Sequence, residues 1–310
     1  MKDQAVKLRE LVDKLNSKNL VFDDNSEEDI IPKEEYKEFK KNARVITITS
    51  GKGGVGKTNI TINLAIKLAQ LGLKVIIIDA DLGLSNVDIV LGKTPKYNLS
   101  DVINYRKNIN DILEEGPYGI KFISGGSGLQ DLIKISKDKL AHLLIEFGKL
   151  DQEADIVFID TGAGISDKVM SFIYAAKEVI VVTTPEPTAI TDAYALIKNI
   201  AQKDKTKNIS IILNRVENSI EARNILEKIY QVCYKFLGLT ICKLGFIYND
   251  INISKAVKMQ EPFIIAYEKS QAALNITDIA RTLVRINHKE DEKKYGLRLF
   301  VNKLKWFFNT

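Results

Sequence analysis

Gly51-Lys52-Gly53-Gly54-Val55-Gly56-Lys57-Thr58 is the stretch that decides the fold of this chain. Residues 44–49 before it are rich in β-branched side chains, and residues 57–71 after it carry apolar side chains at helical spacing. A strand, a glycine-rich loop and a helix in this order form a phosphate-binding loop (P-loop), whose backbone amides cradle phosphate oxygens. In this pattern Lys57 is expected to neutralise the β- and γ-phosphates, and Thr58 to hold Mg²⁺ through its hydroxyl.

The same alternation of strand and helix continues along the chain. Strand-like apolar runs follow at residues 74–79, 156–160, 179–183, 209–213 and 244–247. The segments between them mostly have helical periodicity. Near-continuous apolar strands that alternate with helices indicate a sheet buried on both faces. The sequence therefore predicts an α/β protein with the three-layer P-loop NTPase fold, in which helices flank both faces of a mostly parallel central sheet.

Bulk composition limits the class of protein. The 310 residues, 45% of them hydrophobic, suffice for one main domain with short tails. The longest apolar runs, such as residues 75–78 and 179–182, are far below the ~20 residues that span a bilayer, and no secretory signal precedes them. We therefore expect a cytoplasmic protein. Cys233 and Cys242, without clustered His, indicate neither a disulfide scaffold nor a zinc site.

The net charge of +5 is confined to the C-terminal tail. After the last acidic residue, Glu292, five cationic residues follow: Lys293, Lys294, Arg298, Lys303 and Lys305. Without these five, 40 basic residues are balanced by 40 acidic ones. A balanced body gives no sign of a nucleic-acid surface, so no nucleic-acid partner is expected.

The same tail, residues 288–310, has the pattern of an amphipathic helix. Apolar residues recur at spacings of three and four, at Leu297, Phe300, Val301, Leu304, Phe307 and Phe308. Such a helix, cationic on its other side and carrying Trp306, is expected to lie on an anionic membrane, where each nearby Lys or Arg contributes ~1 kcal/mol. The expected localisation is peripheral and reversible, at the inner face of the cell membrane. The alternative is a terminal helix packed on the protein's own core.

The other end of the chain is an extension before the first strand. Residues 1–15 place Leu8, Leu11, Val12 and Leu15 on one face of a short helix, and residues 16–43 read as a charged linker. We interpret the first part as a docking segment on a tether. The alternative is a helix that packs against its own domain, which we expect to span residues 44–287.

Lys52 makes this loop more than an ordinary P-loop. Lys-Gly-Gly-Val-Gly-Lys-Thr, residues 52–58, resembles the deviant Walker A motif of the MinD and ParA superfamily, and the resemblance extends from Arg44 to about Leu283. It implies a slow ATPase that uses ATP/ADP and Mg²⁺ and forms an ATP-dependent homodimer. Lys52 would cross the dimer interface to the partner's nucleotide, beside the γ-phosphate where transition-state charge is greatest. The alternative is an exposed lysine without a role.

Two aspartate-containing segments resemble the switches of that superfamily. Residues 79–88 look like the first switch, which makes Asp81 the candidate for positioning the attacking water or the metal shell. Residues 160–164 look like Walker B and the second switch: Asp160 would hold a Mg²⁺-bound water, and Gly164 would hinge toward the γ-phosphate. The alternative for either Asp is a helix cap.

Further resemblance completes the expected site. Asn214-Arg215 matches the segment that recognises adenine, and residues 184–193 match the loop that enters the interface helix. The residues expected at the nucleotide are Gly51, Lys52, Gly53, Gly54, Val55, Gly56, Lys57, Thr58, Asn59, Gly164, Asn214 and Arg215. The residues expected in catalysis are Lys52, Lys57, Asp81 and Asp160. Those expected at Mg²⁺ are Thr58, Asp81 and Asp160, the carboxylates through water.

The N-terminus narrows the resemblance to the FlhG family of MinD-like regulators of flagellar number. Asp3-Gln4-Ala5-Val6-Lys7-Leu8-Arg9 is similar to the activator motif of that family, and Asn59 also resembles it. This implies that Asp3, Gln4, Ala5, Leu8 and Arg9 stimulate an FlhF-type GTPase. The ATP dimer would contact flagellar switch-complex proteins at the membrane. The alternatives are a MinD-type regulator of cell division, a ParA-type partition ATPase, and a nucleotide-gated scaffold with negligible turnover.

Overall fold

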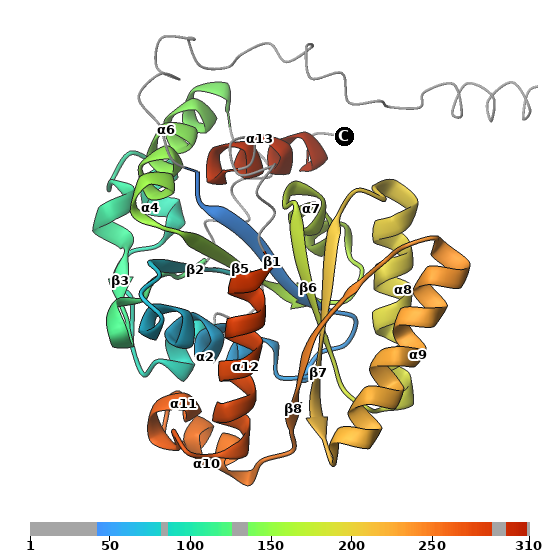
Figure 1. The fold of residues 1–310 in the computed structure, drawn as a ribbon. Coiled ribbons are helices and arrows are strands. Elements are labelled where there is room, and N and C mark those ends of the chain that lie inside the picture. The colour runs from blue at the N-terminus through green and yellow to red at the C-terminus, as the bar shows by residue number, and fades with distance from the viewer. Residues whose placement is uncertain (1–41, 82–85, 126–135, 287–295, 309–310) are drawn as a thin grey trace, which may run out of the picture. The chain divides into compact units, whose positions relative to one another are not determined.

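A computed structural model describes residues 42–81, 86–125, 136–286 and 296–308 (Figure 1). Its centre is an eight-stranded sheet of order β3-β4-β2-β5-β1-β6-β7-β8. All neighbouring strands run parallel except β3, which is antiparallel to β4. The strands are β1 (Arg44–Ser50), β2 (Val75–Ala80), β3 (Glu114–Glu115), β4 (Lys121–Ile123), β5 (Ile156–Ala163), β6 (Glu178–Thr183), β7 (Asn208–Val216) and β8 (Cys242–Tyr248). The predicted fold class is confirmed.

Helices connect these strands and cover both faces of the sheet (Figure 1). The α-helices are α2 (Lys57–Gln70), α3 (Val87–Val90), α4 (Leu99–Ile103), α6 (Lys137–Glu153), α7 (Asp167–Ala175), α8 (Pro187–Lys203), α9 (Ser219–Leu237), α10 (Ile251–Lys258), α11 (Phe263–Ala266), α12 (Gln271–Arg285) and α13 (Leu297–Phe308). Two short 3₁₀ turns are η2 (Ile109–Ile112) and η3 (Pro117–Gly119).

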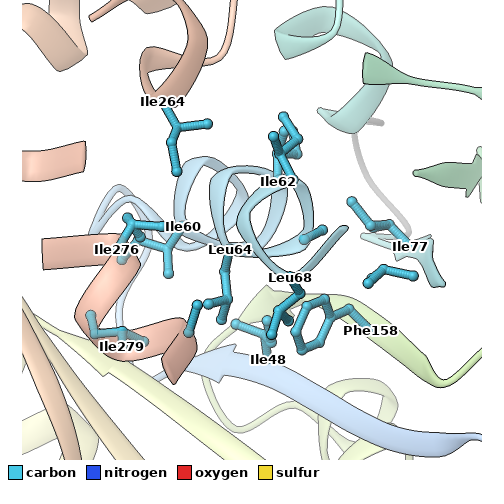
Figure 2. Close-up of a cluster of buried hydrophobic side chains, with 14 of the residues drawn as sticks. Ile48, Ile60, Ile62, Leu64, Leu68, Ile77, Phe158, Ile264, Ile276 and Ile279 are labelled. Atoms are coloured by element: carbon cyan, nitrogen blue, oxygen red, sulfur yellow. The ribbon is translucent and has the colours of Figure 1, made fainter. Parts of the chain in front are cut away.

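One face of the sheet is covered by α2, α11 and α12. Figure 2 shows Leu64 and Leu68 of α2 pointing toward Ile48 of β1 and Phe158 of β5, while Ile60 lies beside Ile276 of α12. The helix meets the sheet this way because its apolar residues recur at helical spacing and strand side chains alternate between faces. Each fully buried side chain of this size contributes about 1.5–3 kcal/mol, so this layer fixes the helix that follows the P-loop.

The opposite face is covered by α7, α8 and α9. Their apolar side chains pack with the alternate residues of β6 and β7, such as Val179, Val181, Ile209 and Ile211. The C-terminal helix α13 lies on this side too, in contact with α6 and α7. Helices on both sides leave the carboxyl ends of the parallel strands as the open edge, where ligands bind in such folds.

Two strands were missed by the sequence analysis. β3 has two residues and β4 has three, and such short strands carry no readable alternation. The six strands that were predicted are all present. Among the described residues, no helix combines the length and the apolar composition needed to cross a bilayer.

Candidate functional site

The P-loop joins β1 to α2 at the carboxyl edge of the sheet. Gly54 and Gly56 have φ of 78° and 93°, a left-handed conformation that side chains disfavour, so glycine is needed at both positions. No side chain caps the start of α2. Its first amides are therefore available to a phosphate, and the helix dipole favours that anion.

Lys57, Thr58 and Asp160 converge behind this loop. Lys57 Nζ donates to Asp160 Oδ1 at 3.1 Å, and Thr58 Oγ1 donates to Asp160 Oδ2 at 2.6 Å. Thr61 Oγ1, one turn along α2, also donates to Asp160 Oδ1 at 3.2 Å. A threonine hydroxyl and a carboxylate in contact, beside a lysine, are the oxygen ligands and the cation that a Mg²⁺-nucleoside triphosphate requires. The residues present therefore fit Mg-ATP.

Asp79 anchors the two ends of the first switch segment. It lies in register with Asp160 on the neighbouring strand, and its carboxylate accepts hydrogen bonds from the backbone amides of Asp81, Asn86 and Val87 at 3.1, 2.9 and 3.2 Å. Burial, and next the charge of Asp160, raise the pKa of Asp79 to about 6, and the three amides oppose that shift. Asp79 was not among the predicted site residues. Its position at the end of the predicted strand 74–79 is the signal that could have identified it.

Asp81 lies beside the second switch. A Cβ at Gly162 would be 3.6 Å from Asp81 Oδ1, so the two switch segments meet at this point. Gly164, with φ of 92°, donates its amide to Ser50 O at 2.8 Å and so ties the second switch to the last residue of β1. The structure thus brings Asp81 and Gly164 to the edge that carries the P-loop. Their roles in hydrolysis stay predictions.

Replacing Asp79 tests whether the first switch must be held in place. We expect Asp79→Asn to bind ATP normally but to hydrolyse it about tenfold or more slowly, because an amide NH₂ would face backbone donors and Asp81 would lose its fixed position. Single-turnover hydrolysis measures the effect. Asp88→Asn is the matched control, since that carboxylate accepts only from the amide of Ile89 within the same short helix, α3, among the hydrogen bonds of the described residues. Equal hydrolysis by Asp79→Asn and wild type would refute the anchoring role.

Lys52 projects from the exposed side of the P-loop. Its Nζ donates to Glu186 Oε2 at 2.9 Å and to Thr188 Oγ1 at 3.2 Å. The two charged side chains are 42% and 56% exposed, so water screens the pair and it contributes little to stability. The hydrogen bond from Lys52 and its charge lower the pKa of Glu186. A weakly held, exposed lysine can exchange Glu186 for another anion. The sequence analysis had assigned no role to Glu186.

The helix that begins at Pro187 rests directly on the P-loop. A Cβ on Gly51 would lie 2.4 Å from the carbonyl of Asp192 and 2.7 Å from the amide of Ala193. Only glycine allows this approach of two backbones. The P-loop and α8, whose first turn carries Thr188, are therefore in direct backbone contact.

Asn214 and Arg215 hold the P-loop in this structure. The buried amide of Asn214 donates through Nδ2 to Val55 O at 2.8 Å, and its Oδ1 accepts from the amide of Arg215 at 2.9 Å. Arg215 has φ of 60°, and its Nη2 donates to Gly54 O at 2.9 Å. Contact of this pair with adenine stays a prediction, and support of the loop is a role that the sequence analysis had not assigned.

The apolar face of α13 is packed inside the protein. Leu297, Phe300, Val301 and Leu304 are buried, and the ring of Phe300 stacks on that of Phe172 in α7 at 6.4 Å. Trp306, by contrast, is 42% exposed. This arrangement is the alternative that the sequence left open, a terminal helix on the protein's own core. Contact of these residues with a membrane stays a prediction. The same holds for Phe307 and Phe308, whose side chains are not among those that the structure describes.

The remaining predicted residues divide into two groups. Gly53 and Asn59 lie in the loop and in the first turn of α2, as expected from the motif. The residues expected to activate a partner, Asp3, Gln4, Ala5, Leu8 and Arg9, lie outside the described residues.

Comparisons with known proteins agree with this geometry. The family model ParA, described as NUBPL iron-transfer P-loop NTPase, matches residues 41–284. The antiactivator FleN of Pseudomonas aeruginosa is 41% identical over 77% of this chain and 85% of its own. The flagellum site-determining protein YlxH of Helicobacter pylori is 37% identical over 71% and 74%. The septum site-determining protein MinD of Bacillus subtilis is 32% identical over 77% and 88%.

Solved structures give the same result. MinD in the MinC:MinD cell division complex of Aquifex aeolicus superposes with a TM-score of 0.64 at 30% identity, covering 79% of this chain and 97% of that one. MinD of Pyrococcus horikoshii complexed with Mg-ADP has a TM-score of 0.63 at 26% identity, over 78% and 96%.

The fold and the site together define a P-loop ATPase with a second lysine in its phosphate loop. The chain belongs to the MinD/ParA family of these enzymes, within the branch of FlhG and FleN, the MinD-like flagellar regulators.

Proposed function

We propose that this ATPase is an ATP-dependent dimerising switch that regulates flagellar number or placement at the cell membrane. The observation that carries the switch is Lys52, exposed on the P-loop and paired with Glu186 at 2.9 Å. In the ATP dimer this lysine leaves Glu186 and reaches the partner's γ-phosphate. The γ-phosphate carries more negative charge than the carboxylate of Glu186. The state in which Lys52 crosses the dimer interface is therefore favoured only while the triphosphate is intact.

Hydrolysis then resets the switch. Lys57 would neutralise the β- and γ-phosphates, Thr58 would hold Mg²⁺ directly and Asp160 through water. Asp81 would orient the attacking water, with its backbone held by Asp79. Mg²⁺ supplies charge neutralisation on the phosphate oxygens when bound. Loss of the γ-phosphate removes the partner of Lys52, and the dimer separates.

The flagellar role is supported by the relatives and by the N-terminus. FleN is described as an antiactivator and YlxH as a flagellum site-determining protein, and both are similar to this chain over most of its ATPase domain. We propose that residues 1–15 stimulate an FlhF-type GTPase, that residues 16–43 tether them to the ATPase domain at residues 44–287, and that the dimer binds flagellar switch-complex proteins.

Membrane association would be the task of residues 288–310. The apolar face of α13 that now packs on α6 and α7 is the face that would enter an anionic bilayer. One short helix binds lipid weakly, whereas a dimer presents two and gains by avidity. ATP-dependent pairing therefore makes binding at the inner face of the membrane reversible.

Removing residues 1–15 separates the flagellar function from the ATPase. We expect the truncated protein to lose stimulation of an FlhF-type GTPase while keeping its ATP affinity and turnover, because the P-loop residues are untouched. GTP hydrolysis by the purified GTPase, with and without the truncated protein, measures this. Gln4→Ala in the full chain tests the motif, and Asn16→Ala, just beyond it, is the control. Undiminished stimulation by the truncated protein would remove the flagellar assignment and favour the MinD-type reading.

A further inference from the structure

One buried carboxylate holds both ends of the described domain. Asp151, in the last turn of α6, is only 1% exposed. Its Oδ1 accepts hydrogen bonds from the amide of Ala43 at 3.3 Å and from the amide of Leu297 at 2.8 Å. Its Oδ2 accepts from the amide of Arg298 at 3.4 Å. Ala43 immediately precedes β1, and Leu297 and Arg298 begin α13, so the carboxylate joins segments that are far apart in sequence.

The backbone crowds around this carboxylate. A Cβ on Gly296 would lie 2.8 Å from Asp151 Oδ2 and 2.9 Å from Asn42 Oδ1. Gly296 is therefore the residue that lets α13 begin directly beside the point at which residues 1–41 join the domain. No other residue type fits there unless Asp151 or Asn42 moves.

A buried carboxylate such as Asp151 destabilises the folded protein when it lacks hydrogen-bond donors. Burial raises its pKa, and the three amides and the positive charge of Arg298 act in the opposite direction. As α13 leaves its site, the carboxylate loses the amides of Leu297 and Arg298 and the favourable N-terminal end of the helix dipole. With only the amide of Ala43 left among these three donors, the charged carboxylate turns toward water, and its long hydrogen bond to Ala43 is weakened.

From this geometry we infer that Asp151 is a clasp that couples the N-terminal tether to the docking of α13. The inference rests on the proposed function, in which residues 1–15 bind a partner and α13 binds lipid. Coupling between two sites is reciprocal. A partner that displaces the chain at Asn42 and Ala43 therefore favours release of α13, and release of α13 loosens Ala43. The GTPase partner and the membrane would act on one another through this single side chain.

The test needs neither lipid nor the GTPase. Leu304→Glu expels α13 without touching Asp151, since Leu304 is buried two turns along the helix. Hydrogen exchange at the amides of residues 43–45 reports on the tether side. Emission of Trp306, the only tryptophan in the chain, reports on α13. In the full-length protein with ADP, we expect Leu304→Glu to speed exchange at Ala43 about tenfold, as for the loss of one buried hydrogen bond of ~1.4 kcal/mol.

Variants of the clasp itself provide the second half of the test. Asp151→Asn and, independently, Gly296→Ala should shift Trp306 emission and speed exchange at Ala43. Leu304→Glu added to Asp151→Asn should have no further effect on Ala43. Glu153→Gln is the matched control at the same helix end, because its partner is Lys121 at 3.0 Å.

Two results would overturn the clasp. One is a shifted Trp306 emission in Leu304→Glu with unchanged exchange at Ala43. The other is an Asp151→Asn protein that matches wild type in both readouts. Failure of the proposed function looks different, because it would appear as absent lipid binding or absent GTPase stimulation in proteins whose exchange data still show coupling.

Discussion

Lys52→Ala should remain a monomer in the presence of Mg-ATP. The side chain lies on the exposed face of the P-loop, and its present contacts are to Glu186 and Thr188 rather than to the residues that surround Asp160. ATP affinity should therefore change little. Dimerisation should be lost, and hydrolysis should fall by about 10²-fold or more, the effect of removing one group that stabilises transition-state charge. Sedimentation with ADP and with ATP measures the assembly, and the phosphate release rate measures turnover.

Anionic vesicles extend the same experiment to the membrane. Wild type should sediment with vesicles in ATP, whereas Lys52→Ala should stay in the supernatant, because single copies of α13 bind too weakly. Lys228→Ala, an exposed lysine on α9, is the control and should behave as wild type. An ATP-dependent dimer of the Lys52→Ala protein would show that the crossing role is wrong, while leaving the ATPase assignment intact.

Lys57→Ala should lose Mg-ATP binding and also weaken the fold. A charged hydrogen bond to phosphate is worth up to about 3 kcal/mol, or roughly 100-fold in affinity. The second effect comes from Asp160, which is buried and receives Lys57 Nζ at 3.1 Å. Removing one member of a buried pair leaves an uncompensated charge and typically costs about 3–5 kcal/mol. The hydroxyls of Thr58 and Thr61 still donate to Asp160, so we expect the lower end of that range.

A double variant separates these two effects. Asp160→Asn in the Lys57→Ala background removes the stranded charge, so the thermal midpoint should recover most of a loss of roughly 6–12 °C. ATP binding should not recover, since the cation is still absent. Calorimetry of the nucleotide-free proteins gives the midpoints, and titration with Mg-ATP gives the affinities. A Lys57→Ala protein as stable as wild type would contradict the energetic role of this pair.

The local pattern of residues 44–71 was sufficient to predict the first strand, the phosphate loop and the following helix. Backbone conformation there follows from glycine and from β-branched and helical spacing, which are properties of neighbouring residues. Asp160 could be proposed because it follows a buried strand, and such strand ends meet at one edge of a parallel sheet. The strands at Glu114–Glu115 and Lys121–Ile123 could not be predicted, because pairing with β2 and with each other defines them, not their own composition.

Contacts between distant segments were beyond the sequence. Glu186 as the partner of Lys52 and Asn214 as a support of the P-loop each depend on which strand lies next to which. The amphipathic pattern of residues 297–308 correctly predicted a helix, but the pattern does not specify what the apolar face packs against. A protein core and a bilayer both bury such a face.

The sequence by itself thus determined a P-loop ATPase with a second lysine, because phosphate binding needs glycines, a lysine and a threonine at consecutive positions. Only the tertiary structure decided that α13 is docked and that Asp151 joins it to the start of β1, because a carboxylate acquires that role from the amides that folding brings around it.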